Sequence, residues 1–224
     1  PHEAEEEPVE GCMDPNATNY DSTANIDDGS CYVPNDCELV PYGHCSGEDL
    51  SGQDLSEMDL TGINFSGANL TEADLTDAYL PYAKMTGANL HWADLTGAYI
   101  GWSNLSGANL WHADLTDAYL KDADLSGVNL SYANLADAEL VYANLADADL
   151  SDTDLRYIHA TYLQGCPDQL PDEWQCVDDD LVGPYANLAY ADFTDAIVTD
   201  VNFTDTYWYQ TIWTDGVVYD ENQA

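Results

Sequence analysis

The sequence contains very few positive charges. Only Lys84, Lys121 and Arg156 oppose 43 Asp and Glu residues, so the formal net charge is −40. Nucleic acids and anionic membranes repel a chain that is this acidic, which makes neither of them an expected partner. The expected partners are cations, basic protein surfaces, and neighbours that divalent ions bridge to this chain.

Long apolar runs and enzyme motifs are missing as well. No stretch approaches the roughly 18 apolar residues that a membrane span needs, so we expect no membrane insertion. The five histidines form no HxxxH or HxH pair, and the chain contains no GxSxG, no Walker loop and no dinucleotide fingerprint. Carboxylates are so frequent that no single pair of them indicates catalysis. We therefore expect a protein that is not an enzyme and has no catalytic residue.

None of the six cysteines forms a CxxC pair, and none lies within residues 46–165. Disulfides stabilise irregular segments, whereas thiolate metal sites generally use closer pairs, so we expect disulfides and an extracellular, oxidising location. A chain that begins at Pro1 rather than Met fits a signal peptide that has been removed. The expected disulfide is Cys166–Cys176, and Cys12–Cys31 and Cys37–Cys45 are hypotheses among the other connectivities.

A period of five residues runs through the centre of the chain. Residues 46–155 divide into 22 consecutive pentapeptides, and each ends in a large apolar residue, which is Leu in nineteen of them. The residue two positions earlier is Ala in fifteen. Side chains two apart share one face of an extended segment, whereas a helix cannot keep a five-residue period on one face. The pattern therefore predicts short extended sides with Ala and Leu inside and a turn after each.

Blocks such as SGANL, TEADL and TDAYL resemble the pentapeptide-repeat family, whose A(D/N)LXX blocks build a right-handed, four-sided parallel β-helix. The resemblance covers most of the chain and implies an all-β solenoid. Four sides of five residues make a coil of twenty, so residues twenty apart would stack at about 4.8 Å.

Stacking at this interval predicts vertical stripes on the outer surface. One stripe is mostly asparagine and begins with Asp49 and Asn69, and a second contains the carboxylates Asp74, Asp94 and Asp114. Exposed aromatic residues usually mark an interface, while stacking between coils and binding to sugar rings are alternatives. The carboxylate stripe is either a solvated acidic face or a place where ions bind. The aromatic interface residues are Tyr79, Tyr82, Trp92, Tyr99, Trp102, Trp111, Tyr119 and Tyr142.

Changes of composition divide the chain into segments. After the regular repeats, PYANL AYADF TDAIV TDVNF resumes the pattern in a new frame, and we expect these blocks to occupy the four sides in their original order. The segments are an acidic tail (1–10), a Cys-rich module (11–45), the β-helix (46–165), a disulfide-closed loop (166–183), the resumed β-helix (184–218) and a C-terminal tail (219–224).

The Cys-rich module is rich in hard oxygen ligands. Because Ca²⁺ takes six to eight oxygens, we expect calcium as a cofactor here, the alternative being an Asx-rich loop that only its disulfide holds. The module is also similar to a short module of secreted proteins from marine microbes, which implies secretion. The expected ligands are Asp14, Asn16, Asn19, Asp21, Asn25, Asp27 and Asp28.

Two functions remain open at this point. The first is a secreted structural protein that assembles with copies of itself into a fibre or surface layer with calcium support. It rests on the unpaired strand edges at β-helix ends and on C-terminal blocks that become more aromatic instead of more charged. The second is a secreted adhesin, a glycan- or protein-binding module that uses the aromatic stripes. Some family members mimic DNA and inhibit gyrase, but the disulfides place this chain in a different compartment.

Overall fold

The computed structural model describes residues 10–11, 21–24, 26–27 and 37–219. The chain divides into two compact units, Pro1–Glu38 and Leu39–Ala224. In the first unit, β1 (Glu10–Gly11) pairs in parallel with β2 (Ile26–Asp27). No helix occurs in the described residues, and so none is long and apolar enough to cross a membrane.

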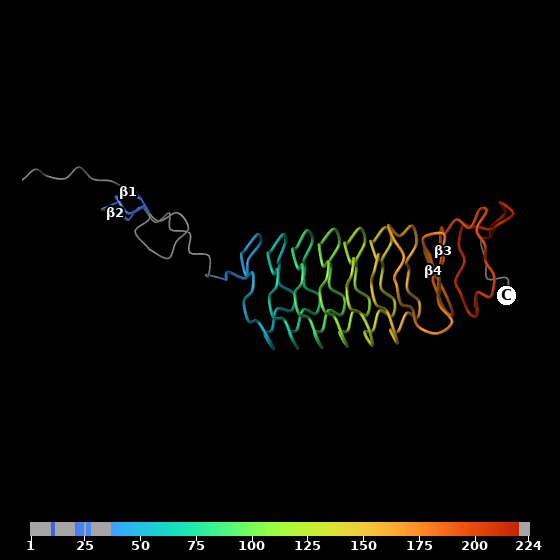
Figure 1. Cartoon of the computed structure of the whole chain (residues 1–224), viewed down its shortest axis with the longest axis horizontal. Helices are drawn as coiled ribbons and strands as arrows, with labels where there is room; N and C mark the ends of the chain where they lie inside the picture. Colours follow the sequence, from blue (N-terminus) through green and yellow to red (C-terminus); the bar gives the residue numbers. More distant parts are fainter. Residues whose placement is uncertain (1–9, 12–20, 25, 28–36, 220–224) are drawn as a thin grey trace, which may run out of the picture. The chain divides into compact units, whose positions relative to one another are not determined.

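The second unit is a right-handed four-sided β-helix, whose coils follow one another from blue to orange in Figure 1. Nearly every pentapeptide up to residue 150 contributes one parallel bridge, at its fourth residue, to the residue twenty positions further along, as from Asn69 to Asn89 and from Tyr79 to Tyr99. The predicted fold and its twenty-residue coil are confirmed.

Two backbone hydrogen bonds on each side connect neighbouring coils. Leu70 N donates to Asn89 O at 2.7 Å, and Asn89 N donates to Ala68 O at 2.9 Å. The turn that follows each side places its second residue in the left-handed region, with φ of +66° at Gly67 and +54° at Asp77. Gly, Asn and Asp adopt this conformation more easily than other residues. The large apolar residue and Ala both point inward from each side, because side chains two positions apart share one face of an extended segment.

The core is a column of alternating Leu and Ala side chains, and nearly all of them are fully buried. The first coil departs from this rule. Glu48, Gln53 and Met58 occupy the positions that Ala holds in later coils, and none of the three is fully buried. Polar and flexible side chains are tolerated there because, among the described residues, no earlier pentapeptide packs on them.

An insertion interrupts the column after Leu170. It contains the antiparallel hairpin of β3 (Gln175–Val177) and β4 (Asp180–Val182), and the predicted Cys166–Cys176 disulfide closes it. Residues 166–170, expected in the loop, still form a side, because Gln169 bridges to Asp149.

The expected order of the sides after the insertion is wrong. Asn187 N donates to Ile158 O at 2.9 Å, which places PYANL on the side of Tyr79 instead of the side of Asn69. The difference is two sides. Residues 166–170, which were expected in the loop, fill the side of Asn69, and the hairpin segment takes the place of the side that follows it.

The C-terminal end of the column is closed by aromatic side chains that pack inward. Phe193 is the buried centre of a cluster against which Trp174, Phe203, Trp208 and Trp213 pack. The last strands, β5 (Thr211–Ile212) and β6 (Val218–Tyr219), form an antiparallel pair, so β6 covers an edge of β5. The aromatic C-terminal blocks, expected to leave this end uncapped, therefore contribute to closing it.

The disulfides of the described cysteines match the predicted pairs. Cys37 pairs with Cys45, as Cys166 does with Cys176, and no described cysteine is free. Cys12 and Cys31 lie outside the described residues.

Candidate functional site

Tyr79, Tyr99 and Tyr119 form a stacked column on one side of the β-helix. The ring centroids are 5.0 Å apart in the first pair and 4.5 Å in the second, with interplanar angles of 29° and 9°. Burial, together with the neighbouring Tyr99 and Glu139, raises the pKa of Tyr119 to about 12. The stacking between coils that the sequence suggested as an alternative is therefore present.

The adjacent corner carries what we call the aromatic edge, which consists of Tyr82, Trp102, Tyr142 and Tyr162. Tyr82 stacks on Trp102 at 5.7 Å between ring centroids, and Tyr142 stacks on Tyr162 at 5.4 Å. Asp122 occupies the same corner between the two pairs, and the Nζ atom of the neighbouring Lys121 lies 5.5 Å above the Tyr142 ring. The edge is thus a run of rings along several coils.

The Tyr column and the aromatic edge form one surface. The Trp102 ring lies 6.2 Å from the Tyr99 ring and 6.4 Å from the Tyr119 ring, measured between centroids. Tyr82 and Trp102 keep 57% and 41% of their surface exposed, so stacking covers only part of each ring. A continuous, partly exposed aromatic surface of this kind suits contact with another molecule.

A second aromatic group, the His–Trp cluster, lies at another corner and consists of His91, Trp92, Trp111, His112 and Tyr132. Trp92 stacks on His112 at 4.4 Å, and His112 stacks on Tyr132 at 5.2 Å between ring centroids. Trp111 meets His91 edge-on at 4.5 Å. Sequence reasoning named the two Trp residues as interface residues and did not assign the histidines a role, but the rings form one group.

The corner position of these aromatic residues has a conformational cost. Tyr82, Trp102 and Tyr142 have φ values of +60°, +58° and +63°, in the left-handed region where glycine stands at Gly62 of the same corner. For residues other than Gly, Asn and Asp this region costs roughly 1–2 kcal/mol. Stacking and partial burial offset the cost in the folded protein, and part of each ring remains exposed.

The polar stripes have mostly structural roles. In the asparagine ladder, Asn89 Nδ2 donates to Asn69 Oδ1 at 3.4 Å, and Asn109 and Asn129 repeat the contact at 3.1 and 3.2 Å. In the carboxylate stripe, Asp74 and Asp94 each accept a hydrogen bond of 3.0 Å from the backbone N–H two residues later. These side chains therefore stabilise turns and neighbouring coils.

The acidic residues of the first coil show the same pattern. Bonds from the Ser51 and Ser56 hydroxyl and backbone N–H groups lower the pKa of Asp49 and Asp54, and Thr61 does the same for Asp59. No group of three or more His, Cys, Asp or Glu side chains within the described residues is placed to hold a metal ion.

Only two of the predicted calcium ligands, Asp21 and Asp27, are among the described residues. Asp21 accepts hydrogen bonds from the N and Oγ1 atoms of Thr23 at 2.8 and 2.6 Å, and Asp27 belongs to β2. Calcium binding by this module stays a prediction. The other five expected ligands, Asp14, Asn16, Asn19, Asn25 and Asp28, lie outside the described residues.

Sequence reasoning missed a pocket beside the insertion. The pocket brings Tyr142 and Tyr162 of the aromatic edge together with Asp180 of β4 and its acidic neighbours. The run DDD at 178–180 was the available signal. It could not be placed, because nothing in the sequence shows where the hairpin returns to the column.

Comparisons with known proteins agree with this architecture. A family profile described as "Pentapeptide repeats" matches eight copies, in overlapping stretches that span residues 45–156, half of the chain. A search among curated proteins found no match.

Solved structures with similarity to this chain include three pentapeptide repeat proteins. Rfr23 from the cyanobacterium Cyanothece 51142 is 24% identical, with 51% of this chain and 91% of that chain covered and a TM-score of 0.43. HetL from Nostoc sp. strain PCC 7120, involved in heterocyst differentiation regulation, is 28% identical, with 78% and 86% covered and a TM-score of 0.24. A protein from the Arabidopsis thaliana thylakoid lumen is 26% identical, with 70% and 72% covered and a TM-score of 0.20.

Proposed function

This chain belongs to the pentapeptide-repeat family, whose members are generally non-catalytic binding or structural proteins, and we propose that it is a non-enzymatic extracellular scaffold that binds a basic partner protein through its aromatic edge. Its disulfides suggest an oxidising compartment, which supports an extracellular location.

The observation that carries the proposal is the partly exposed aromatic edge itself. Its rings sit at corner positions where Gly62 and Asp122 show that smaller residues are accommodated. Large aromatic residues in a left-handed conformation are costly, yet at this corner their rings also remain partly exposed. The exposed halves of the rings are available to a partner.

The charge of the surroundings indicates a basic partner. The chain carries a net charge of −40, and Arg156, one of its three basic side chains, is paired with Asp154. Arg and Lys side chains bind favourably over the faces of Trp and Tyr rings, and the contact of Lys121 with Tyr142 shows this geometry within the chain. An aromatic surface inside a strongly negative field therefore favours Arg- or Lys-rich protein surfaces.

A binding titration with a defined probe tests this proposal. The probe is the peptide Ac-GRGRGRG-NH2, followed by tryptophan fluorescence at physiological salt, with Ac-GQGQGQG-NH2 as the uncharged comparison. Cation–π contacts contribute about 0.5–1 kcal/mol each at exposed sites. The double variant Tyr82→Gly/Trp102→Gly should therefore bind the probe about tenfold more weakly, without a change of net charge.

The matched control is Tyr157→Gly. Tyr157 is also exposed and left-handed, with φ of +63°, but it lies outside the aromatic edge. This variant should bind the probe as the unaltered protein does. Equal affinities for the double variant and the unaltered protein would show that charge alone binds the peptide.

Self-assembly is a second candidate, supported by the first coil of the β-helix. The backbone N–H groups of Asp49, Asp54 and Asp59 have no acceptor within the described residues, whereas the corresponding groups of later coils do. Unpaired edges of this kind invite pairing with another chain. Light scattering and electron microscopy, with and without a chelator, test assembly and its calcium support; monodisperse monomers in both conditions would contradict this candidate.

A further inference from the structure

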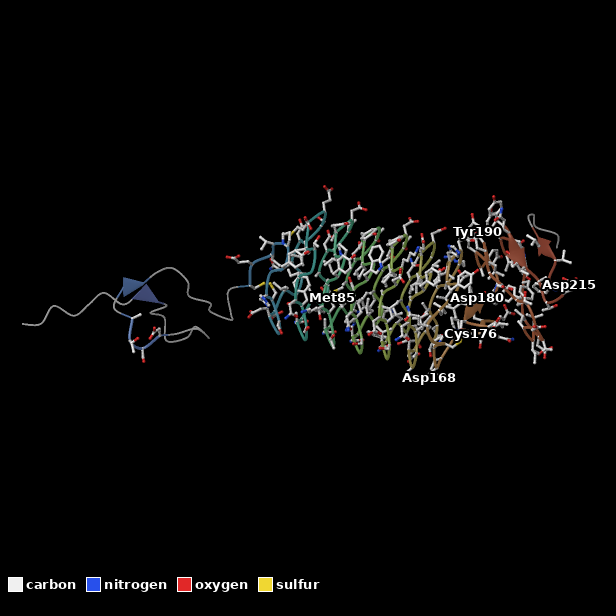
Figure 2. The ribbon with its side chains drawn as sticks, turned by 90° about the horizontal axis from the view of Figure 1, so that it is seen from above. Met85, Asp168, Cys176, Asp180, Tyr190 and Asp215 are labelled. Carbon is white, nitrogen blue, oxygen red and sulfur yellow. A yellow bond between two sulfur atoms is a disulfide. The ribbon has the colours of Figure 1, made fainter. Side chains whose placement is uncertain are left out.

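A pocket of about 390 Å³ lies between the aromatic edge and the insertion. The coil residues that line it come from consecutive coils of one corner. The others come from the turn before β4, from β4 itself, and from residues 192 and 194 of the resumed repeats. Figure 2 shows Asp180 in the C-terminal part of the column, near Cys176 and Tyr190. The lining residues are Tyr142, Tyr162, Leu163, Asp178, Asp179, Asp180, Asp192 and Thr194.

Asp180 is the chemically unusual member of this lining. Only about 1% of its surface is exposed, and its Oδ1 atom accepts a hydrogen bond of 2.8 Å from Tyr162 N. Its Oδ2 atom is buried and has no hydrogen-bond partner within the described residues. Burial, with the nearby carboxylates of Asp178 and Asp179, raises the pKa of Asp180 to about 7. A buried carboxylate oxygen without a partner is costly unless a ligand satisfies it.

The other charged groups around the pocket have the same sign. Asp178 and Asp179 are exposed, and both have left-handed backbones with φ of +50° and +64°. Asp192 accepts a hydrogen bond of 2.9 Å from Thr194 N. No basic side chain lines the pocket, so four carboxyl groups face a cavity without a compensating cation.

The arrangement favours an organic cation over a bare metal ion. The described His, Cys, Asp and Glu side chains nowhere gather in threes at distances that would hold a metal ion. An ammonium or guanidinium group carries several N–H donors and can reach carboxylates that stand further apart. The stacked rings of Tyr142 and Tyr162 provide an aromatic wall for it.

We propose that this pocket binds an ammonium or guanidinium group, carried either by a free amine or by a Lys or Arg side chain of a partner protein. Asp180 Oδ2 accepts a hydrogen bond from the cation, and Asp178, Asp179 and Asp192 supply the negative field. This site is separate from the exposed rings of Tyr82 and Trp102, so it can exist whether or not those rings bind a partner.

The test is calorimetric titration of the full chain with two probes, putrescine and the peptide Ac-Gly-Arg-Gly-NH2. Saturable binding by either probe that Asp180→Asn weakens at least about tenfold supports the proposal. Binding of putrescine alone identifies a free amine as the ligand source, and binding of the peptide alone identifies a partner side chain. No saturable binding of either probe, or binding that Asp180→Asn leaves unchanged, would overturn it.

Two further variants keep the test independent of folding and of total charge. If Asp180→Asn does not fold, the exposed pair Asp178→Asn/Asp179→Asn takes its place and should weaken binding in the same way. Asp137→Asn makes the same change of charge as Asp180→Asn at an exposed, left-handed corner outside the pocket lining, and it should not affect binding. Calcium that saturates the site and displaces both probes, with an effect that Asp180→Asn abolishes, would also contradict the proposal.

The pH dependence of binding provides a second readout. The titratable groups that face Asp180 are Asp178, Asp179, Asp192, Tyr142 and Tyr162. Burial raises the pKa of Asp180 to about 7, so the ionised form that accepts the cation increases about tenfold between pH 6 and pH 8. The affinity should rise by the same factor, and Asp180→Asn should remove this dependence. The Tyr82→Gly/Trp102→Gly variant should leave it intact, which separates this inference from the proposed function.

Discussion

The asparagine ladder permits a prediction in which a single atom decides the outcome. Asn109 Nδ2 donates to Asn89 Oδ1 at 3.1 Å, and Asn109 Oδ1 accepts from Asn129 Nδ2 at 3.2 Å and from Trp111 N at 3.3 Å. Asn109→Asp keeps the acceptor but replaces the donor by a second oxygen, which faces the Asn89 oxygen in a partly buried place.

The expected destabilisation follows from the lost donor. An unsatisfied polar contact of this kind costs about 1–3 kcal/mol, so the free energy of unfolding of Asn109→Asp should be lower by that amount at pH 7. The new carboxyl group has a folded-state pKa above its unfolded value, because its neutral form can donate to Asn89. Relative to the unaltered protein, the loss is therefore absent below the unfolded pKa of about 3.9 and appears as the pH rises through the folded pKa.

Urea denaturation of both proteins between pH 4 and pH 7, followed by circular dichroism, measures this difference. The first residue of the ladder provides a matched control. Asp49 donates no hydrogen bond in the ladder and accepts one there, from Asn69 Nδ2 at 2.9 Å. Asp49→Asn should change the stability by less than about 1 kcal/mol. If Asn109→Asp is as stable as the unaltered protein at pH 7, or its loss does not depend on pH, the ladder is not a hydrogen-bonded unit.

Three other predictions concern the core, the insertion and the pocket. Leu110→Ala removes a fully buried side chain and should cost about 2–5 kcal/mol in urea denaturation; a loss under about 1 kcal/mol would contradict a close-packed column. Cys166→Ser/Cys176→Ser should cost about 2–4 kcal/mol, and hydrogen exchange should show the increased opening mainly at β3 and β4; no change there would contradict a stapling role. Because the folded pKa of Asp180 is raised to about 7, its contribution is complete below the unfolded pKa and is lost as the pH rises through 7. Thermal melts should therefore show Asp180→Asn gaining stability relative to the unaltered protein from pH 4 to pH 8, and a constant difference would refute the burial of a charge there.

The repeating part of the fold could be predicted from the sequence because its pattern has one physical solution. A large apolar residue every five positions, with Ala two before it, cannot lie on one face of a helix. The same spacing put Tyr79, Tyr99 and Tyr119 in one column and Asn69, Asn89 and Asn109 in another, and the structure has both. In these stripes, residues twenty positions apart are in contact, so the contacts follow directly from the length of the coil.

The path of the insertion could not be predicted in this way, because the five-residue period places residues only where the repeat continues. The blocks at 161–165 and 166–170 depart from the repeat at Gly165, where a large apolar residue is expected, and at Pro167. The backbone of the first block still hydrogen-bonds to the preceding coil at Gln164, and that of the second forms a bridge to it at Gln169. The block at 161–165 was expected to form a side, but residues 166–170 were expected in the loop, and the hairpin was not expected to take the place of a side. The predicted position of PYANL was therefore displaced by two sides. The pocket depends on the path of the hairpin back to the column, and that path is set by tertiary contacts such as Leu181 N to Ala160 O.

The C-terminal blocks show a different limit. Trp208 and Trp213 follow the five-residue period as large inward residues, but the aromatic side chains around them were interpreted as an exposed end. In the structure their rings lie 5.2 Å apart between centroids and pack near Phe193 and Phe203. Aromatic composition alone does not distinguish a closed end from an adhesive one, because the same residues are suited to both.

The most direct measurement of the central claim is a hydroxyl-radical footprint of the protein with and without saturating Ac-GRGRGRG-NH2, quantified by mass spectrometry. If the aromatic edge is the binding surface, oxidation of Tyr82 and Trp102 should fall strongly on binding, while oxidation of the exposed Tyr157 and Tyr207 should stay the same. Protection confined to residues outside the edge, or equal protection over all exposed aromatic residues, would contradict the claim.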